Sequence, residues 1–196
     1  MIEYLKGKLT ETSPTYCVIE CGGVGYGMNI TLLDYDFLNN TDNKENLKMY
    51  VHESIREDAH ELFGFREKSA REAFRMLIGV SGVGPNTARL ILSSLTVEQL
   101  EAAISSGNEV PLKSVKGIGG KTAQRIIVDL KDKINGAARS LNLSATVSGG
   151  SFDDAASALV MLGFSLQQSQ KALTKVFGNN PALSTEQAIK LALKML

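Results

Sequence analysis

The sequence predicts a multidomain α+β protein, in which a small β-barrel is followed by an all-helical segment and then by a bundle of three helices. Three observations lead to this fold class. Residues 1–64 hold short β-forming runs separated by glycine-containing turns, residues 65–140 carry one glycine motif twice between helical runs, and residues 151–196 hold three helix starts. We expect these ranges to be domains, with residues 141–150, rich in small and polar side chains, as a flexible linker.

The first 64 residues are expected to form strands. Five short strands with glycine at the bends suit a closed barrel of the OB type. Residues 31–38 fit either a short helix or a loop. Because the segment is acidic and has few aromatic residues to spare, we expect a scaffold and subunit interface, and not the single-strand-binding groove of many OB barrels. One strand is expected to begin with Tyr4–Leu9, and the others are expected at Tyr16–Cys21, Val24–Ile30, Leu47–His52 and Leu62–Phe65.

The central segment contains one motif twice, as Gly-Val-Gly at residues 82–84 and Gly-Ile-Gly at residues 117–119, 35 residues apart. Each copy stands between two helical runs, and the second run opens at Pro85 or Gly120. Glycine permits a positive φ and removes the Cβ that would hold a partner away. The N–H groups of the turn and of the next helix then face outwards with the positive helix end behind them, which makes an anion site. Since main-chain amides do not read bases, the motif predicts phosphate binding to nucleic acid without sequence preference.

The helices around this motif follow from apolar residues at helical spacing. We expect helices after Arg66, from Pro85, from a capping box at Thr96, over a short stretch before the second motif, and over Lys121–Lys133. In the first of these, the charged side chains, Arg71 among them, are expected mostly away from the buried face. The apolar residue of each glycine motif should anchor its turn. The residues expected on buried faces are Ala70, Phe74, Leu77, Ile78, Ala88, Ile91, Leu92, Leu95, Ala123, Ile126, Ile127 and Leu130.

Residues 151–196 are expected to form three helices that look like a UBA-type bundle. The aspartates at 153–154 charge the start of the first helix, and Gly163 ends it. Ser165 and Ser184 open the other two with capping-box spacing, and the third is expected to reach the last residue. With little net charge, this unit is expected to bind protein and not DNA. Its core-facing residues in the first helix are expected to be Ala155, Leu159 and Leu162.

The formal net charge is zero, with 21 basic and 21 acidic residues, but it is unevenly divided. Residues 1–64 carry 5 Lys and Arg against 11 Asp and Glu, residues 65–140 carry 12 against 7, and residues 141–196 carry 4 against 3. The basic surface therefore coincides with the second glycine motif, as phosphate binding requires. The charged residues between Glu109 and Asp129 are all basic, namely Lys113, Lys116, Lys121 and Arg125.

Other interpretations of the motifs fit less well. A P-loop ending at Gly120-Lys121-Thr122 would need glycine where Val115 stands, and a dinucleotide fingerprint would need glycine at Thr122. Base-excision glycosylases also use a hairpin of this kind, but theirs is a single hairpin followed by a Gly-Pro-Asp segment. No Gly-Pro-Asp occurs in this sequence. Two plain helical turns without a ligand are a further alternative, against which the duplication of an unusual glycine pattern argues.

Composition gives no sign of a metal site, a cofactor or a membrane segment. Cys17 and Cys21 are expected to be free, buried thiols, and His52 and His60 a strand residue and a surface residue. No run of 18 apolar residues occurs and the N-terminus lacks the apolar core of a signal peptide, so we expect a cytosolic protein.

Taken over essentially the whole chain, these motifs resemble the RuvA family, whose members bind Holliday junctions within the bacterial RuvAB branch-migration complex. The resemblance implies a non-catalytic protein of DNA recombination, DNA repair and the SOS response to DNA damage, acting as a homotetramer or as a pair of tetramers. It also implies that residues 151–196 bind the RuvB motor, which carries the ATPase, and that the RuvC resolvase is a partner. An enzyme built on hairpins and a generic duplex-binding subunit are the alternatives.

The resemblance also assigns sites. The Arg-Glu-Asp-Ala sequence at 56–59 matches an acidic pin at the junction centre, so Glu57 and Asp58 are expected to repel phosphates there. The chain departs from many family members at Asn86 and Gly120, where a basic residue is common, so two potential phosphate cations are absent. The expected DNA-binding residues are Gly82, Val83, Gly84, Asn86, Thr87, Lys116, Gly117, Ile118, Gly119, Lys121, Thr122 and Arg125.

Overall fold

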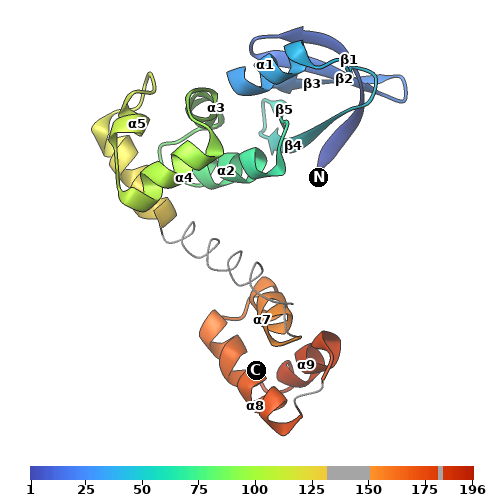
Figure 1. The fold of residues 1–196 in the computed structure, drawn as a ribbon, viewed down its shortest axis with the longest axis vertical. Coiled ribbons are helices and arrows are strands. Elements are labelled where there is room, and N and C mark those ends of the chain that lie inside the picture. The colour runs from blue at the N-terminus through green and yellow to red at the C-terminus, as the bar shows by residue number, and fades with distance from the viewer. Residues whose placement is uncertain (132–150, 181–182) are drawn as a thin grey trace. The chain divides into compact units, whose positions relative to one another are not determined.

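The computed structural model describes residues 1–131, 151–180 and 183–196 (Figure 1). The chain divides into two compact units, Met1–Gly136 and Ala137–Leu196. The linker expected at residues 141–150 lies outside the described residues. Within the described ranges, no helix combines the length and the apolar character that crossing a membrane requires.

The N-terminal barrel has the five strands that the sequence predicts, closed in the order β1-β2-β3-β5-β4 (Figure 1). Neighbouring strands are antiparallel except β3 and β5, which pair in parallel at Asn29 and Phe63. Gly7 allows a close approach of β1 to β2, because a Cβ there would lie 1.9 Å from the carbonyl oxygen of Glu20. The strands are β1 Tyr4–Ser13, β2 Tyr16–Cys21, β3 Val24–Asn29, β4 Leu47–Ile55 and β5 His60–Phe65.

The segment that the sequence left open between helix and loop forms a helix, α1 (Leu32–Asn40). Its N-cap is Thr31, whose hydroxyl accepts from the N–H of Asp34 at 3.0 Å and donates to the Asp34 carboxylate at 2.6 Å. The other oxygen of that carboxylate accepts a 2.8 Å bond from the N–H of Arg66. Burial raises the pKa of Asp34, and these hydrogen bonds oppose the shift. The helix is thereby tied to the chain where it leaves the barrel.

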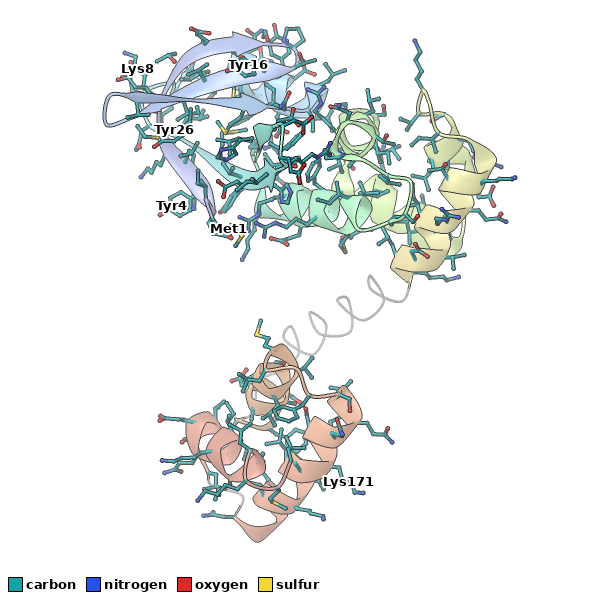
Figure 2. All side chains as sticks on the ribbon, turned by 180° about the vertical axis from the view of Figure 1, so that it is seen from behind. Met1, Tyr4, Lys8, Tyr16, Tyr26 and Lys171 are labelled. Atoms are coloured by element: carbon teal, nitrogen blue, oxygen red, sulfur yellow. The ribbon has the colours of Figure 1, made fainter. Side chains whose placement is uncertain are left out.

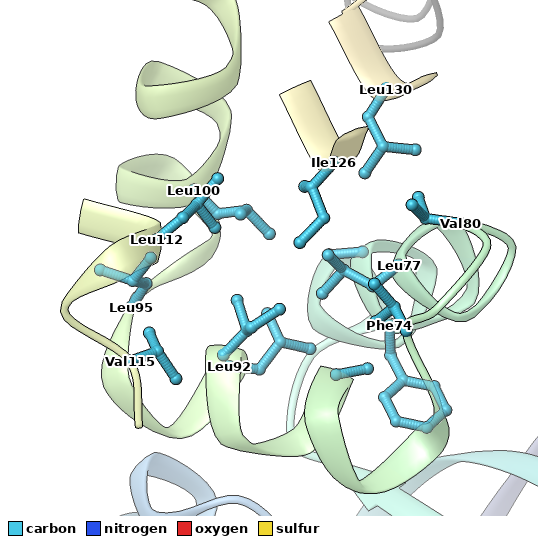
Figure 3. Packing of buried hydrophobic residues seen from close by; sticks show 14 of the residues in the cluster. Phe74, Leu77, Val80, Leu92, Leu95, Leu100, Leu112, Val115, Ile126 and Leu130 are labelled. Atoms are coloured by element: carbon cyan, nitrogen blue, oxygen red, sulfur yellow. The ribbon is translucent and has the colours of Figure 1, made fainter. Parts of the chain in front are cut away.

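A second core lies among the helices that follow the barrel. Figure 3 shows their apolar side chains meeting in one cluster, which reaches the barrel through Phe63 and Phe65. The ring centroids of these two residues each lie 5.0 Å from that of Phe74. The residues expected to be buried lie in this core, except Ala70 and Ile78, which are only partly buried. The helices are α2 (Lys68–Ile78), α3 (Pro85–Ser94), α4 (Val97–Ser106, with the expected capping box), α5 (Val110–Lys113) and a helical segment over residues 120–131.

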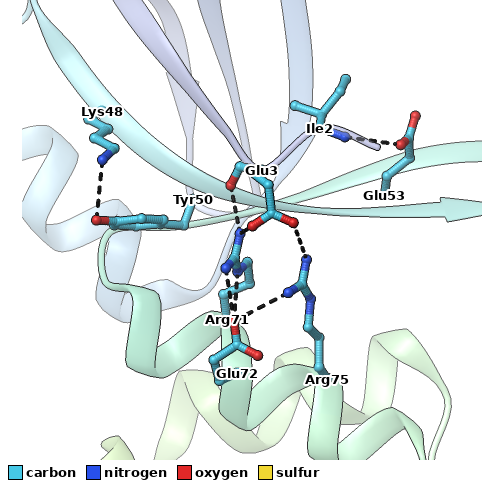
Figure 4. Close-up of polar contacts among 8 residues, drawn as sticks. All are labelled: Ile2, Glu3, Lys48, Tyr50, Glu53, Arg71, Glu72 and Arg75. Atoms are coloured by element: carbon cyan, nitrogen blue, oxygen red, sulfur yellow. Dashed lines mark hydrogen bonds and ion pairs between the residues drawn. The ribbon is translucent and has the colours of Figure 1, made fainter. Parts of the chain in front are cut away.

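One charged residue of α2 contradicts the prediction. Arg71 was expected away from the buried face, but its side chain is only 2 % exposed. Its Nη1 donates to the carbonyl oxygen of Glu3 at 2.7 Å, and its guanidinium pairs with the carboxylates of Glu3 and Glu72 (Figure 4). Arg75 reaches the same two carboxylates at 3.5 and 3.2 Å. Helical spacing predicts which residues share a face, but it does not reveal that a partner 68 residues earlier covers one of them.

The C-terminal unit is the three-helix bundle that the sequence predicts, with α7 (Ser151–Met161), α8 (Leu166–Asn179) and α9 (Thr185–Ala192). Capping boxes open α8 and α9 as expected. Two expectations are wrong. Leu162 is 60 % exposed because α7 ends before it and the chain turns at Gly163, and α9 ends at Ala192, before the last residue. The bundle core consists of Ala155, Ala156, Leu159, Ala172, Leu173, Val176, Ala188 and Ala192.

Figure 2 shows Tyr4 and Tyr16 on the barrel, and both side chains contact other parts of it. The Nζ of Lys48 lies 4.3 Å from the ring centroid of Tyr4 and 4.6 Å from that of Tyr50. Tyr16 crosses β3 at Gly27, where a Cβ would lie 1.8 Å from the tyrosine hydroxyl oxygen. These rings are thus engaged in contacts within the barrel.

Both cysteines are free thiols. Cys17 is buried, as expected, and burial raises its pKa to about 12. Cys21 is only partly buried, and its Sγ donates to the carbonyl oxygen of Lys6 at 3.3 Å. The raised pKa of Cys17 is the opposite of the lowered pKa that makes a thiol reactive.

Candidate nucleic-acid interface

The two glycine motifs form two hairpins of closely similar backbone. The first hairpin (residues 79–88) joins α2 to α3, and the second hairpin (residues 114–123) joins α5 to the helical segment 120–131. The φ angle is +88° at Gly82 and +90° at Gly117, in the region that favours glycine. The repeat in the sequence is therefore a repeat in the structure.

The apolar residue of each motif anchors its turn, as expected. Val83 is 4 % exposed and Ile118 is 6 % exposed. Their N–H groups donate to the carbonyl oxygens of Val80 at 3.0 Å and Val115 at 3.1 Å. Both turns are therefore held from the core side, and their glycines are exposed on the other side.

The second glycine of each motif has a different task from the first. Gly84 is the N-cap of α3 with a φ of −84°, and Gly119 is not among the glycines of positive φ. A Cβ at either position would meet no atom within 4 Å, so these glycines keep the surface of the turn bare. Within residues 1–131, the N–H groups of all four motif glycines donate to no backbone acceptor. Main-chain donors at a helix start with nothing in front of them fit an anion.

Polar side chains surround both turns. Asn86, Lys116, Lys121 and Arg125 are exposed, and Thr87 and Thr122 are partly buried. Lys113, which the sequence adds to the basic surface, pairs with Glu109 at 2.6 Å, so much of its charge is neutralised. In the described part of the chain, the other three cations near the second hairpin have no carboxylate within 4.0 Å.

The acidic loop lies at the tip of a strand hairpin, between β4 and β5. The N–H of Arg56 donates to the carbonyl oxygen of Ala59 at 2.8 Å and closes the turn. Glu57 and Asp58 are both exposed at this tip. A short loop on two paired strands can present two carboxylates to a ligand without burying either charge.

The strands below the loop are joined by a histidine–carboxylate contact. His60 Nε2 lies 3.0 Å from Glu53 Oε1, and the N–H of Ile2 donates to the other Glu53 oxygen at 3.3 Å. The hydrogen bond from His60 holds the pKa of Glu53 below its ordinary value, and the bond from Ile2 acts in the same direction. His52, one strand position away from Glu53, packs its ring 5.3 Å from Phe74.

Three family models match the chain in order. They are described as RuvA N terminal domain over residues 1–64, SAM-like helix-hairpin-helix tandem over residues 74–132, and RuvA C-terminal domain over residues 151–196. Relatives in Parabacteroides distasonis, Bacteroides thetaiotaomicron and Flavobacterium psychrophilum are 51 %, 48 % and 45 % identical, each over 100 % of both chains. All three carry the name Holliday junction branch migration complex subunit RuvA. The chain belongs to the RuvA family.

Membership of the RuvA family agrees with the architecture, an OB barrel followed by a tandem helix-hairpin-helix domain and a C-terminal helical bundle. The two positions at which the sequence is expected to depart from many family members fall at equivalent helix starts. Asn86 lies in the first turn of α3, and Gly120 begins the second helix of the second hairpin. A Cβ at Gly120 would lie 3.3 Å from Cε of Lys113, so the stem of that lysine fills the space beside it.

Two residues beside the first hairpin are absent from the set that the sequence predicts. Arg89, on α3, donates from Nη1 to the carbonyl oxygen of Thr15 at 3.1 Å, which links the hairpin to the barrel. Ser81 accepts on its carbonyl oxygen a 3.2 Å bond from Nη1 of Arg125, which links the two hairpins. The one available signal was the position of Arg89 three residues after Asn86, on the same helix face.

Among the described residues, no group of three His, Cys, Asp or Glu side chains is placed to hold a metal ion.

Proposed function

We propose that this chain is the junction-binding subunit of a branch-migration complex. It binds four-way DNA junctions through phosphates, holds the crossing point open and recruits a separate ATP-hydrolysing motor, without catalysing a reaction itself. The observation that carries this proposal is the pair of hairpins with matching φ angles and exposed glycine turns whose N–H groups have no backbone acceptor. The relatives, named as Holliday junction branch migration complex subunits, support it.

In this proposal the hairpins contact only the sugar-phosphate backbone. The N–H groups of the motif glycines and of the helix starts that follow donate to phosphate oxygens, which are the same at every base pair. Binding is therefore independent of the DNA sequence. Exposed lysine and arginine side chains add charge-assisted bonds. Four copies would place eight hairpins on a junction, two on each arm, with each pair straddling a minor groove. The contacting residues are Gly82, Val83, Gly84, Asn86, Thr87, Lys116, Gly117, Ile118, Gly119, Lys121, Thr122 and Arg125.

The acidic loop favours a four-way junction over a plain duplex as the ligand. Two exposed carboxylates on a rigid strand hairpin would weaken binding to a uniform phosphate surface, since like charges repel. At a junction centre the same charges keep the crossing strands on separate paths. Glu57 and Asp58 therefore act as an electrostatic pin.

The C-terminal unit is proposed to bind the RuvB motor. We take residues 1–64, 65–140 and 151–196 as domains and residues 141–150 as the linker that lets the last domain reach the motor. The three-helix bundle carries little net charge and exposes apolar side chains at the end of α7, where Met161 is 90 % exposed, and at the start of α8, where Leu166 is 56 % exposed. Such side chains suit a protein partner better than a phosphate backbone.

The proposed assembly is a homotetramer, alone or as two tetramers enclosing one junction, acting in the bacterial cytoplasm in recombination and repair. The RuvC resolvase would act on the same junction. Light scattering of the full chain, with and without junction DNA, measures the subunit number directly.

A competition experiment tests the DNA-binding proposal. A labelled four-way junction bound to the full chain is displaced by an unlabelled junction or by linear duplex of equal length, with and without Mg²⁺. We expect the junction to compete at far lower concentration, and junctions of unrelated sequence to compete equally. Equal competition by linear duplex would favour a generic duplex-binding subunit. ATP hydrolysis by the purified chain alone would overturn the non-catalytic assignment. Removing residues 151–196 should abolish stimulation of the RuvB motor but leave junction binding intact.

A further inference from the structure

The two hairpins share a backbone but not a charge. Moving 35 residues along the chain, Ser81 corresponds to Lys116, and Asn86 corresponds to Lys121. No lysine or arginine occurs from residue 76 to residue 88, so the first hairpin has no cation of its own. Its turn nevertheless has the same φ angle and the same bare glycine surface as the cationic second hairpin.

One cation reaches the first hairpin from the second. Arg125 lies in the helical segment 120–131, and its Nη1 donates to the carbonyl oxygen of Ser81 at 3.2 Å and lies 3.4 Å from the Ser81 hydroxyl. A Cβ built on Gly82 would be 3.9 Å from the same Nη1. The guanidinium therefore lies beside the glycine corner of the first hairpin, although Arg125 belongs to the helical segment that follows the second hairpin.

Another cation reaches the first hairpin from one turn further along α3. Arg89 is anchored to the barrel, because its Nη1 donates to the carbonyl oxygen of Thr15 at 3.1 Å and lies 3.4 Å from Oδ1 of Asn29. Its Nη2 lies 3.5 Å from Oδ1 of Asn86. With that oxygen turned towards Arg89, the exposed Asn86 side chain has its amide N–H₂ available as a donor. The second hairpin has Gln124 at the position equivalent to Arg89.

Both arginines keep an uncompensated charge. Their acceptors are carbonyl, hydroxyl and amide oxygens, all of them neutral. Within residues 1–131 neither has a carboxylate within 4.0 Å, whereas Arg66 has one and Arg71 and Arg75 have two each. A guanidinium has five N–H donors in a planar fork, so neutral contacts at one edge leave donors for a phosphate.

We propose that the first hairpin binds its phosphate with cations from outside its own turn, Arg89 from the next turn of α3 and Arg125 from the helical segment that follows the second hairpin. This proposal rests on the proposed function. It adds Arg89 to the contacting residues and assigns Arg125, already among them, to the phosphate site of the first hairpin. Arg125 also ties the two turns together, so the pair of hairpins meets the DNA at a fixed spacing. Arg89 plays the corresponding part towards the barrel and holds Asn86 in its donating orientation.

The test is the salt dependence of junction binding by the full chain. Each lost phosphate contact should make the slope of log affinity against log salt shallower by about 0.9. Arg89→Gln and Arg125→Gln should each make the slope shallower by at least that amount. Asn29→Ala is the matched control for Arg89, because it removes a barrel contact and keeps the charge, and it should leave the slope unchanged. Lys8→Gln, which removes a barrel cation already paired with Glu45 at 2.8 Å, should also leave it unchanged.

A variant in which the cation is moved to another position separates the loss of a charge from misfolding. Asn86→Lys combined with Arg89→Gln moves the cation to the first turn of α3, where the second hairpin has it, and should restore the slope that Arg89→Gln loses. Methylphosphonate substitutions then locate the contact. Neutralising a phosphate at the first hairpin should weaken binding less in Arg89→Gln and Arg125→Gln than in the unaltered chain. In Lys121→Gln the same neutralisation should weaken binding as much as it does in the unaltered chain.

The two levels of proposal fail in different ways. If the unaltered chain does not prefer the junction, the proposed function is wrong. If it binds the junction but Arg89→Gln and Arg125→Gln leave its salt slope unchanged, the arginines have only a structural role and this inference is overturned. The same conclusion follows if Asn29→Ala makes the slope as shallow as Arg89→Gln does.

Discussion

The Nη1 of Arg71 donates a 2.7 Å hydrogen bond to the carbonyl oxygen of Glu3, so the first helix of the hairpin region holds the start of the first barrel strand. The guanidinium is almost fully buried, while the two carboxylates that neutralise it are about half exposed (Figure 4). Because the carboxylates stay hydrated, only the guanidinium bears a large desolvation cost, so the cost is smaller than for a pair buried on both sides. The barrel and the hairpins are thereby held in one orientation.

Replacing this arginine should destabilise the N-terminal unit. Arg71→Ala removes the bond to Glu3, both ion pairs and the packing of the aliphatic stem, and we expect it to lower the free energy of unfolding by about 2–3 kcal/mol. Arg75→Ala is the matched control, since its side chain is 27 % exposed and its loss should cost less than about 1 kcal/mol. Urea unfolding measures both values. Equal effects of the two substitutions would show that burial of Arg71 has no energetic weight.

Acid should weaken the same contact. The hydrogen bond from Arg71 holds the pKa of Glu3 below its ordinary value of 4.5, so the unfolded chain binds the proton more readily than the folded chain. The stability that this contributes is present above about pH 4.5 and is lost as the pH falls through the lower folded-state pKa. Glu3→Gln should therefore flatten the loss of stability below pH 4.5, measured by urea unfolding at a series of pH values.

Asp34 provides a control of opposite sign. Burial raises its pKa, so the folded chain binds the proton more readily, and its protonation as the pH falls through that raised pKa favours the folded state. Asp34→Asn removes this gain and should steepen the loss of stability on acidification. A chain in which both substitutions leave the pH profile unchanged would show that neither carboxyl group governs it.

The local parts of this structure follow from the sequence. Capping boxes at Thr96, Ser165 and Ser184, glycines at the hairpin corners, and five short β-forming runs each depend on residues a few positions apart. Such signals are read directly from spacing, and they predict the fold class and the two hairpins. The charge segregation along the chain also placed the basic surface at the second hairpin.

What the sequence hides is contact between distant segments. Arg71 meets Glu3 across 68 residues, Arg125 meets Ser81 across 44, and Arg89 meets Thr15 across 74. An arginine has a long apolar stem and a planar donor fork, so the same residue suits an exposed face, a buried ion pair or a phosphate site. Its role is decided by what the fold places in front of it. Leu162 illustrates the local limit, because a helix that ends one residue earlier puts it on the surface.

The neutral residue at the start of α3 should make DNA binding less sensitive to salt than a lysine there would. Asn86 is exposed in the first helical turn, where a cation would lie beside the turn's N–H groups. Asn86→Lys should steepen the slope of log affinity against log salt by about 0.9 for each added phosphate contact. Fluorescence anisotropy with a four-way junction at several salt concentrations measures the slope. An unchanged slope would place this residue away from the DNA.

The exposed pair Glu57 and Asp58 should control the movement of DNA strands more than the affinity for them. At about 5 Å and an effective dielectric constant of about 20 to 40, one carboxylate–phosphate repulsion is on the order of 2–3 kcal/mol. Removing both charges with Glu57→Gln and Asp58→Asn should therefore leave junction binding intact or tighter. The rate of motor-driven branch migration should change, because strands at the centre are no longer kept apart. Asp36→Asn with Asp42→Asn makes the same charge change elsewhere on the barrel and should alter neither. Loss of binding in the loop variant, with a normal unfolding curve, would mean that the two acids support the junction site and do not repel its strands.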